Sequence, residues 1–118
     1  MDWQEVLEHP SLQDLPFKIE TNELGQIVMS PATNKHSLYQ TRIVQLLAEL
    51  LGGRSFVECS ISTTKGVKVA DAVWTSDGFF EKYREQTPYP QAPEICVEVL
   101  SPSNTQTEME EKITLYLA

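Results

Sequence analysis

The sequence predicts a small mixed α/β (α+β) domain, in which a central mixed sheet is flanked by helices. The chain has 118 residues, a length that suits one compact domain over residues 1–118. Stretches in which apolar and polar residues alternate, as in strands, lie between segments whose apolar residues recur at helical spacing. This order of elements is typical of a sheet with helices packed on it.

The first part of the chain is predicted to contain a lead-in helix and a hairpin. Residues 1–16 begin with apolar residues at helical spacing, and Pro10 ends that helix. Residues 17–20 and 26–29 are predicted strands. The turn-forming residues 21–25 between them indicate a hairpin.

A long helix is predicted over residues 35–51, and Gly52-Gly53 ends it. Its apolar residues form one stripe at helical spacing: Tyr39, Ile43, Leu46, Leu47 and Leu50. Two strands follow over residues 55–61 and 67–74, joined by a turn around residues 64–66.

The last part of the chain is predicted to hold a helical turn, a buried strand and a final helix. The helical turn covers residues 79–85. Residues 95–100 form the strand with the most buried pattern. The final helix begins after residues 101–105, where Ser103 and Gln106 would form a capping box.

Composition excludes several classes of protein. The longest apolar runs are far shorter than the roughly 20 residues that cross a bilayer, and the N-terminus lacks the pattern of a secretory signal. Cys59 and Cys96 are isolated thiols that suit a reducing compartment, so we expect a cytoplasmic protein without membrane contact. Nine Lys and Arg against 17 Asp and Glu give a net charge of −8, which by itself disfavours tight binding of nucleic acid.

Two carboxylates lie inside otherwise apolar strands. Asp71 lies in the predicted strand 67–74, and Glu98 lies in the predicted strand 95–100. A charge in such a strand is costly unless it is paired or binds a metal. Alternation would place a single carboxylate on a solvated face, but two favour a shared site that binds Mg²⁺ or Mn²⁺ through oxygen ligands.

Three further residues are candidates on weaker grounds. Lys112 lies at the edge of the stripe that the final helix is predicted to bury: Met109, Ile113, Tyr116 and Leu117. By itself it is more typical of a solvated lysine paired with Glu108. His36 alone is more typical of a packed or capping residue than of a ligand, and Glu20 of a solvated strand end.

A series of short motifs runs in fixed order from about residue 17 to the end. The matching pieces are residues 19–20 and 25–31, His36 at a helix start, residues 69–74 and 93–103, and then Lys112 and Tyr116. The string Glu-Val-Leu-Ser-Pro-Ser from Glu98, with Lys112 at the fourteenth position after that glutamate, is the most specific. These motifs resemble the Uma2 family of endonuclease-like proteins, which belongs to the PD-(D/E)XK nuclease superfamily and is abundant in cyanobacteria.

The resemblance implies a restriction endonuclease-like fold and metal-dependent hydrolysis of phosphodiester bonds in DNA. Asp71 is similar to the aspartate of the superfamily's first motif, although Ala70 replaces the usual proline. Glu98 is similar to the acidic residue of the second motif. The usual lysine position is Leu100, and family members are thought to supply this lysine from the next helix, where Lys112 lies.

The resemblance therefore implies catalytic roles for Asp71, Glu98 and Lys112. The two carboxylates would bind Mg²⁺ or Mn²⁺, and Lys112 would orient the attacking water or stabilise the developing charge. Glu20 and His36 match recurrent family positions and would support the site.

Three interpretations of the function stay open at this point. Family members continue beyond the final helix into another strand, so the chain resembles a member shortened at its C-terminus. A sheet edge left open there would favour a homodimer. The acidity and the shortened end favour a catalytically idle scaffold that acts as an interaction module, whereas the three site residues favour a nuclease. The third possibility is an enzyme acting on another phosphate-bearing substrate.

Overall fold

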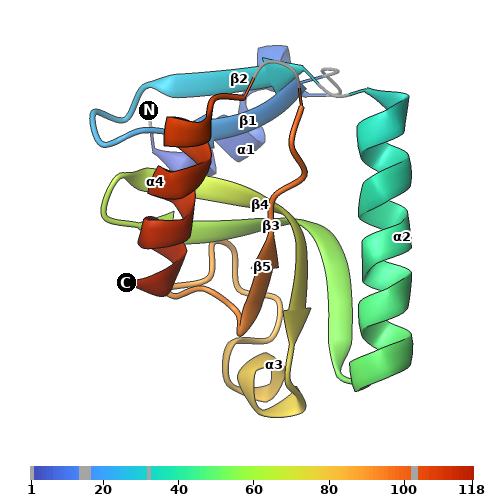
Figure 1. Cartoon of the computed structure of the whole chain (residues 1–118). Helices are drawn as coiled ribbons and strands as arrows, with labels where there is room; N and C mark the ends of the chain where they lie inside the picture. The colour runs from blue at the N-terminus through green and yellow to red at the C-terminus, as the bar shows by residue number, and fades with distance from the viewer. Residues whose placement is uncertain (1, 14–16, 32, 102–103) are drawn as a thin grey trace.

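The computed structural model describes residues 2–13, 17–31, 33–101 and 104–118. Helices and strands follow one another along the chain as shown in Figure 1. In order they are α1 (Trp3–Glu8), the short 3₁₀ helix η1 (Pro10–Leu12), β1 (Phe17–Thr21), β2 (Ile27–Pro31), α2 (Asn34–Leu51), β3 (Arg54–Thr63), β4 (Gly66–Thr75), α3 (Asp77–Tyr83), β5 (Ile95–Val97) and α4 (Gln106–Leu117).

The described strands form two small antiparallel sheets. β1 and β2 make a hairpin in which Phe17 lies opposite Pro31. The other sheet has the order β3-β4-β5, with Val73 opposite both Phe56 and Cys96. Figure 1 shows the hairpin at one end of the molecule, with α2 along one side and α4 along the other. The predicted mixture of helices and strands is confirmed, but the strands are divided between two sheets instead of forming one central mixed sheet.

β4 is the most buried of the described strands. It is the middle strand of its sheet, and its residues 69–73 are all buried. The expectation that residues 95–100 would form the most buried strand is wrong. β5 covers only Ile95–Val97, is partly exposed, and lies at the edge of the sheet, while Leu100 is exposed.

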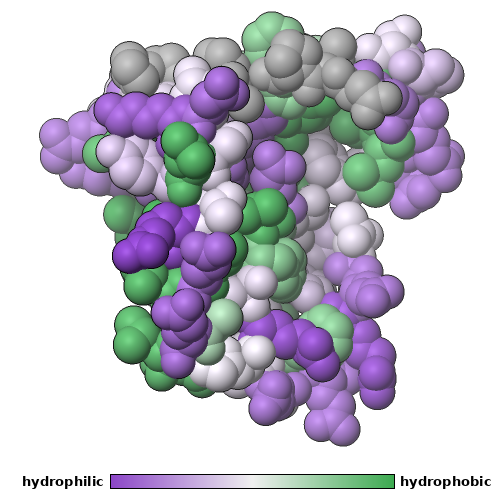
Figure 2. Space-filling model, turned by 90° about the vertical axis from the view of Figure 1, so that its right-hand side faces the viewer, coloured by the Kyte–Doolittle hydropathy of each residue, from purple (hydrophilic) through white to green (hydrophobic). Residues whose placement is uncertain are grey.

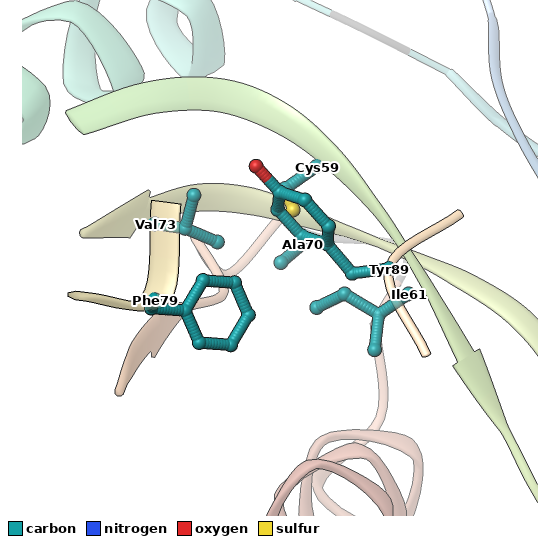
Figure 3. Close-up of a cluster of buried hydrophobic side chains, with 6 residues drawn as sticks. All are labelled: Cys59, Ile61, Ala70, Val73, Phe79 and Tyr89. Atoms are coloured by element: carbon teal, nitrogen blue, oxygen red, sulfur yellow. The ribbon is translucent and has the colours of Figure 1, made fainter. Parts of the chain in front are cut away.

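The apolar core lies around β3 and β4. The close-up in Figure 3 shows its buried members together: Cys59, Ile61, Ala70, Val73, Phe79 and Tyr89. The rings of Phe79 and Tyr89 meet edge to face, with centroids 5.1 Å apart, an arrangement that aromatic pairs favour. This cluster attaches α3 and the loop that precedes β5 to the sheet.

Helix α2 begins and ends as its sequence predicts, but its apolar stripe is not fully covered. Thr33 caps the helix by accepting a hydrogen bond from the backbone N–H of His36, and Gly52 ends it with a φ of 67°. Leu50 is 78% exposed, and Tyr39 and Leu46 are also exposed. Figure 2 shows that hydrophobic and hydrophilic side chains are interspersed on this side of the molecule.

Helix α4 begins directly after residues 101–105, as predicted, but its capping box differs from the predicted one. Thr105 and Glu108 form the capping box, in which the Thr105 side chain accepts from the Glu108 backbone and Glu108 accepts from the Thr105 backbone. This corrects the predicted pairing of Ser103 with Gln106, and Ser103 itself lies outside the described residues.

The inward face of α4 also differs from the predicted stripe. Ile113 is 57% and Leu117 82% exposed. The half-buried residues are Met109, Lys112, Leu115 and Tyr116. Lys112 therefore lies within the inward face of α4 instead of at its edge. Across the part of the chain that the structure describes, no helix is long and apolar enough to span a bilayer.

Candidate active site

Asp71 lies in the middle of β4 and is only 1% exposed. Its Oδ2 accepts a 2.6 Å hydrogen bond from the backbone N–H of Val99, and His36 Nε2 lies 3.2 Å from the same oxygen. Its Oδ1 accepts a hydrogen bond from Lys18 Nζ at 3.0 Å. Burial would raise the pKa of Asp71, but the Lys18 ammonium and the Val99 N–H lower it below its usual value. The carboxylate is thus held in its ionised form.

Glu98 follows β5 and shares partners with Asp71. Its Oε2 accepts a hydrogen bond from Lys18 Nζ at 3.2 Å. Its Oε1 accepts from Tyr116 Oη at 2.7 Å and from Lys112 Nζ at 3.3 Å. Burial raises the pKa of Glu98, and the two ammonium groups offset this only in part. The environments of the two neighbouring carboxyl groups therefore push their pKa values in opposite directions.

Glu20 is a buried carboxylate that links β1 to both β4 and α4. Its Oε2 accepts hydrogen bonds from the backbone N–H of Val69 at 2.7 Å and from Lys112 Nζ at 2.8 Å. The next residue, Thr21, accepts the backbone N–H of Val67 on its Oγ1 at 2.9 Å. These contacts hold the first hairpin against the part of β4 that precedes Asp71.

The close approach of β1 to β4 requires the glycine at position 66. Gly66 has a φ of 90°, and a Cβ atom there would lie 2.6 Å from the backbone carbonyl oxygens of Thr21 and Asn22. Any side chain at this position would push the end of β1 away from β4. The placement of Glu20 therefore depends on Gly66, a residue without a side chain.

Lys18 is a site residue that the sequence analysis did not identify. Its Nζ contacts Asp71 Oδ1 and Glu98 Oε2 and lies 3.9 Å from Glu20 Oε2, while its side chain is 12% exposed. Burial would lower the pKa of Lys18, but the three carboxylates raise it well above its usual value. The available signal was the spacing to Glu20, because residues two apart in a strand lie on the same face.

The structure thus brings together all five residues that the sequence singled out, together with two more. We call this set the ion network: Lys18, Glu20, His36, Asp71, Glu98, Lys112 and Tyr116. Three carboxylates face two ammonium groups in it. Its members come from β1, α2, β4, the segment after β5, and α4, so the hairpin, the second sheet and the two long helices must all be in place to build it.

The donor set suits a hard divalent cation. Asp71 Oδ1 and Glu98 Oε2 converge on one positive group, the Lys18 ammonium. Carboxylate oxygens and waters are the ligands that Mg²⁺ and Mn²⁺ prefer. In the described ranges no set of three or more His, Cys, Asp or Glu side chains is arranged as a metal site. Water would therefore have to supply most ligands.

Two of the hollows that adjoin the ion network reach Lys112. A cavity of about 30 Å³ is lined by Lys18, Asp71, Glu98 and Lys112 among others, and this is enough room for a water molecule or an ion. A wider groove of about 430 Å³ between the first hairpin and α4 reaches Glu20 and Lys112. Its ionisable lining consists of four glutamates and two lysines: Glu20, Glu23, Glu108, Glu111, Lys68 and Lys112.

Comparison with known proteins places the chain in a family. The model of the Uma2 family, described as "Putative restriction endonuclease", matches residues 3–118. A crystal structure of "a putative nuclease belonging to DUF820" from Anabaena variabilis is similar in fold, with a TM-score of 0.68 and 22% sequence identity. The match covers 92% of this chain and 65% of that one. No curated protein matches. Because the family match includes every residue of the ion network, and nearly the whole chain, the chain belongs to the Uma2 family.

Proposed function

We propose that the protein is a metal-dependent nuclease that hydrolyses phosphodiester bonds in DNA. Asp71 and Glu98 would hold Mg²⁺ or Mn²⁺, and Lys112 would act beside them. The observation that carries the proposal is the convergence of Asp71 Oδ1 and Glu98 Oε2 on one cation, at 3.0 and 3.2 Å from Lys18 Nζ. Membership of a family described as "Putative restriction endonuclease" supports the reaction class.

Each residue of the proposed site would have its own role in phosphodiester hydrolysis. Asp71 and Glu98 would hold a divalent ion, whose chemistry when bound would be to polarise the scissile phosphate and to lower the pKa of a bound water. Lys112, held by Glu20 at 2.8 Å, keeps a positive charge beside Glu98, where it can orient the water or stabilise the developing negative charge. Tyr116 fixes the orientation of Glu98 through its 2.7 Å hydrogen bond.

Asp71 is oriented from both sides of its carboxylate. The Val99 N–H fixes Oδ2, and His36 lies next to the same oxygen. This leaves Oδ1, on the side of Lys18, as the oxygen that would face the metal. A ligand whose rotamer is fixed in this way binds a metal with less loss of conformational freedom.

The charge of the chain shapes how DNA would bind. The net charge is −8, and the groove beside the site carries more glutamates than lysines. Lys and Arg contacts to phosphates normally supply most of the affinity for DNA. We therefore expect weak binding by the chain alone, with the divalent ion or a basic partner supplying the missing positive charge.

Calorimetric titration with Mn²⁺ and Mg²⁺ tests the metal site. Wild type should bind, whereas Asp71→Asn and Glu98→Gln should both lose binding. Glu111→Gln is the matched control, because Glu111 is an exposed carboxylate paired with Lys65 on the surface of α4. Wild type and Glu111→Gln should cleave supercoiled plasmid, whereas Asp71→Asn and Glu98→Gln should not. Lys112→Met should retain metal binding but lose cleavage. Wild-type affinity in both Asp71→Asn and Glu98→Gln would refute the proposed site.

A second candidate is a catalytically idle scaffold of the same fold that acts as a protein interaction module. The observation in its favour is that Asp71, Glu98 and Glu20 all have hydrogen-bonding partners within the chain. If wild type shows no metal binding at millimolar concentrations while Asp71→Asn destabilises the fold, the ion network is structural and this candidate replaces the nuclease.

A further inference from the structure

We infer that Lys18 is a tethered cation that competes with the divalent metal for the position between Asp71 and Glu98. Its ammonium must leave that position before a metal can occupy it. The inference rests on the proposed function, because it concerns how the same two carboxylates receive their metal.

The geometry makes the two cations mutually exclusive. Lys18 Nζ lies 3.0 Å from Asp71 Oδ1 and 3.2 Å from Glu98 Oε2, so it occupies the point on which both oxygens converge. With Lys18 in place, the adjoining cavity that it lines measures about 30 Å³, which holds one water but not a metal ion together with its own waters. Two positive charges at contact distance in a buried site would also repel each other strongly.

No other described lysine has this position. Lys112 contacts the opposite oxygen of Glu98, Oε1, and is otherwise held by Glu20. Lys18 is the one cation within the described ranges that contacts both Asp71 and Glu98. Removing its charge should therefore free the metal position, whereas Lys112 can stay in place when the metal binds.

The structure has space for the Lys18 side chain outside the position between Asp71 and Glu98. Besides the small cavity at the site, it lines a second cavity of about 320 Å³ that is bordered by α1 and β1. Glu58 lines both cavities, and Glu20 Oε2 lies 3.9 Å from the ammonium. A displaced Lys18 would thus keep carboxylates within its reach. A long, flexible side chain can make such a change by rotation about its own bonds.

The test is calorimetric titration of the whole chain with Mn²⁺ alone, in wild type, Lys18→Met and Lys65→Met. Methionine keeps the length of the side chain and removes the charge. We expect Lys18→Met to lower the dissociation constant by about tenfold or more, since residues in one ion network are strongly coupled. Lys65→Met, which removes an exposed lysine paired with Glu111, should leave it unchanged. Equal or weaker binding by Lys18→Met would overturn the inference.

Thermal melting gives a readout that does not depend on activity. Without metal, Lys18→Met should melt below wild type, because three clustered carboxylates lose a counter-ion. With saturating Mn²⁺, its melting temperature should rise by more than that of wild type. An equal rise in the two proteins would contradict competition.

A further measurement does not require Lys18→Met, should that variant fail to fold. In lysine side-chain NMR, the Lys18 resonance should shift on titration with Mg²⁺, and it should not shift in Asp71→Asn. A Lys18 resonance that stays fixed while the Glu98 carboxyl resonance moves would overturn the inference.

Failure of the inference can be told from failure of the proposed function. Metal binding that Asp71→Asn abolishes and Lys18→Met leaves unchanged would overturn the competition and leave the nuclease proposal standing. An absence of metal binding in both wild type and Lys18→Met would overturn both. Binding by Lys18→Met and not by wild type would support the inference but refute metal-dependent cleavage by the wild-type chain.

Discussion

The side-chain amide of Gln40 donates a hydrogen bond to the backbone carbonyl oxygen of Asp71, at 3.0 Å. Gln40 is 6% exposed and is the one buried residue among those described in α2. One turn earlier on the same face of the helix, His36 lies beside the Asp71 carboxylate. Polar contacts to Asp71 therefore hold α2 in register with β4, while much of the helix's apolar stripe stays exposed.

Replacing Gln40 should loosen α2. Gln40→Ala removes the partner of a buried carbonyl, so we expect the free energy of unfolding to fall by about 1–3 kcal/mol. Urea denaturation measures the change. Gln45→Ala, at an exposed position of the same helix, is the control and should have little effect. Equal losses in the two variants would show that the contact with Asp71 is not what Gln40 contributes to stability, because alanine favours the helix at both positions.

Removing the Tyr116 hydroxyl should change the titration of Glu98. The hydrogen bond from Tyr116 favours the ionised form of Glu98, so Tyr116→Phe should raise the pKa of Glu98 further. NMR titration of the Glu98 side-chain carboxyl reports this directly. Tyr39→Phe removes the hydroxyl of an exposed tyrosine and should leave that pKa unchanged. A Glu98 pKa that is the same in Tyr116→Phe as in wild type would mean that the hydrogen bond does not form.

The capping box should matter for α4 as a whole. Thr105→Ala removes the side chain that caps the helix, and we expect a loss of about 1 kcal/mol in the free energy of unfolding. Thr105→Ser keeps the hydroxyl and should recover most of it. Thr107→Ala, at the second residue of the helix, should cause no comparable loss. Chemical denaturation followed by circular dichroism measures the free energy of unfolding of the three variants. A Thr105→Ala variant as stable as wild type would show that the helix does not start at this cap.

Stability should fall in alkaline solution. Burial raises the pKa of the Cys59 thiol from an ordinary value of 9.0 to about 12. The unfolded chain therefore loses this proton at lower pH than the folded chain does. The contribution of Cys59 to stability is complete below pH 9 and is lost as the pH rises toward 12, by at most about 1.4 kcal/mol per pH unit.

Urea denaturation between pH 8 and pH 10.5 checks this slope. Cys59→Ala should show a shallower decline than wild type, and the remaining decline should include Cys96, whose pKa burial also raises to about 12. Parallel declines in wild type and Cys59→Ala would show that the thiol titrates normally.

The spacing of apolar residues predicted where most helices and strands lie, but not which of their side chains are buried. The strand and helix periods placed the first hairpin, α2, β3, β4 and α4 to within a few residues. Exposure depends on the distant segments that pack on each element, which is why α2 and β5 turned out less buried than their sequences suggest. In α4, the apolar stripe pointed to Ile113 and Leu117, but the helix turns Lys112 and Tyr116 inward to meet buried carboxylates.

The site residues that could be predicted are the carboxylates that lie in otherwise apolar stretches of sequence. Asp71 and Glu98 were identified because carboxylates in apolar strands need partners, and the structure brings them to one cation. Lys18 escaped notice because a lysine in a short strand with alternating residues looks like an ordinary solvated one. Only the packing of the first hairpin on β4 reveals that this lysine faces inward.

The ion network joins residues that are far apart along the chain. Lys112 and Glu20 are 92 positions apart, and Lys18 and Glu98 are 80 apart. Closing loops of this length costs entropy that is repaid only once both ends are in place. Until α4 docks, Glu20 and Glu98 lack the ammonium and hydroxyl that offset their burial. Assembly of the site should thus be a late event in folding, and substitutions in it should act mainly by speeding unfolding.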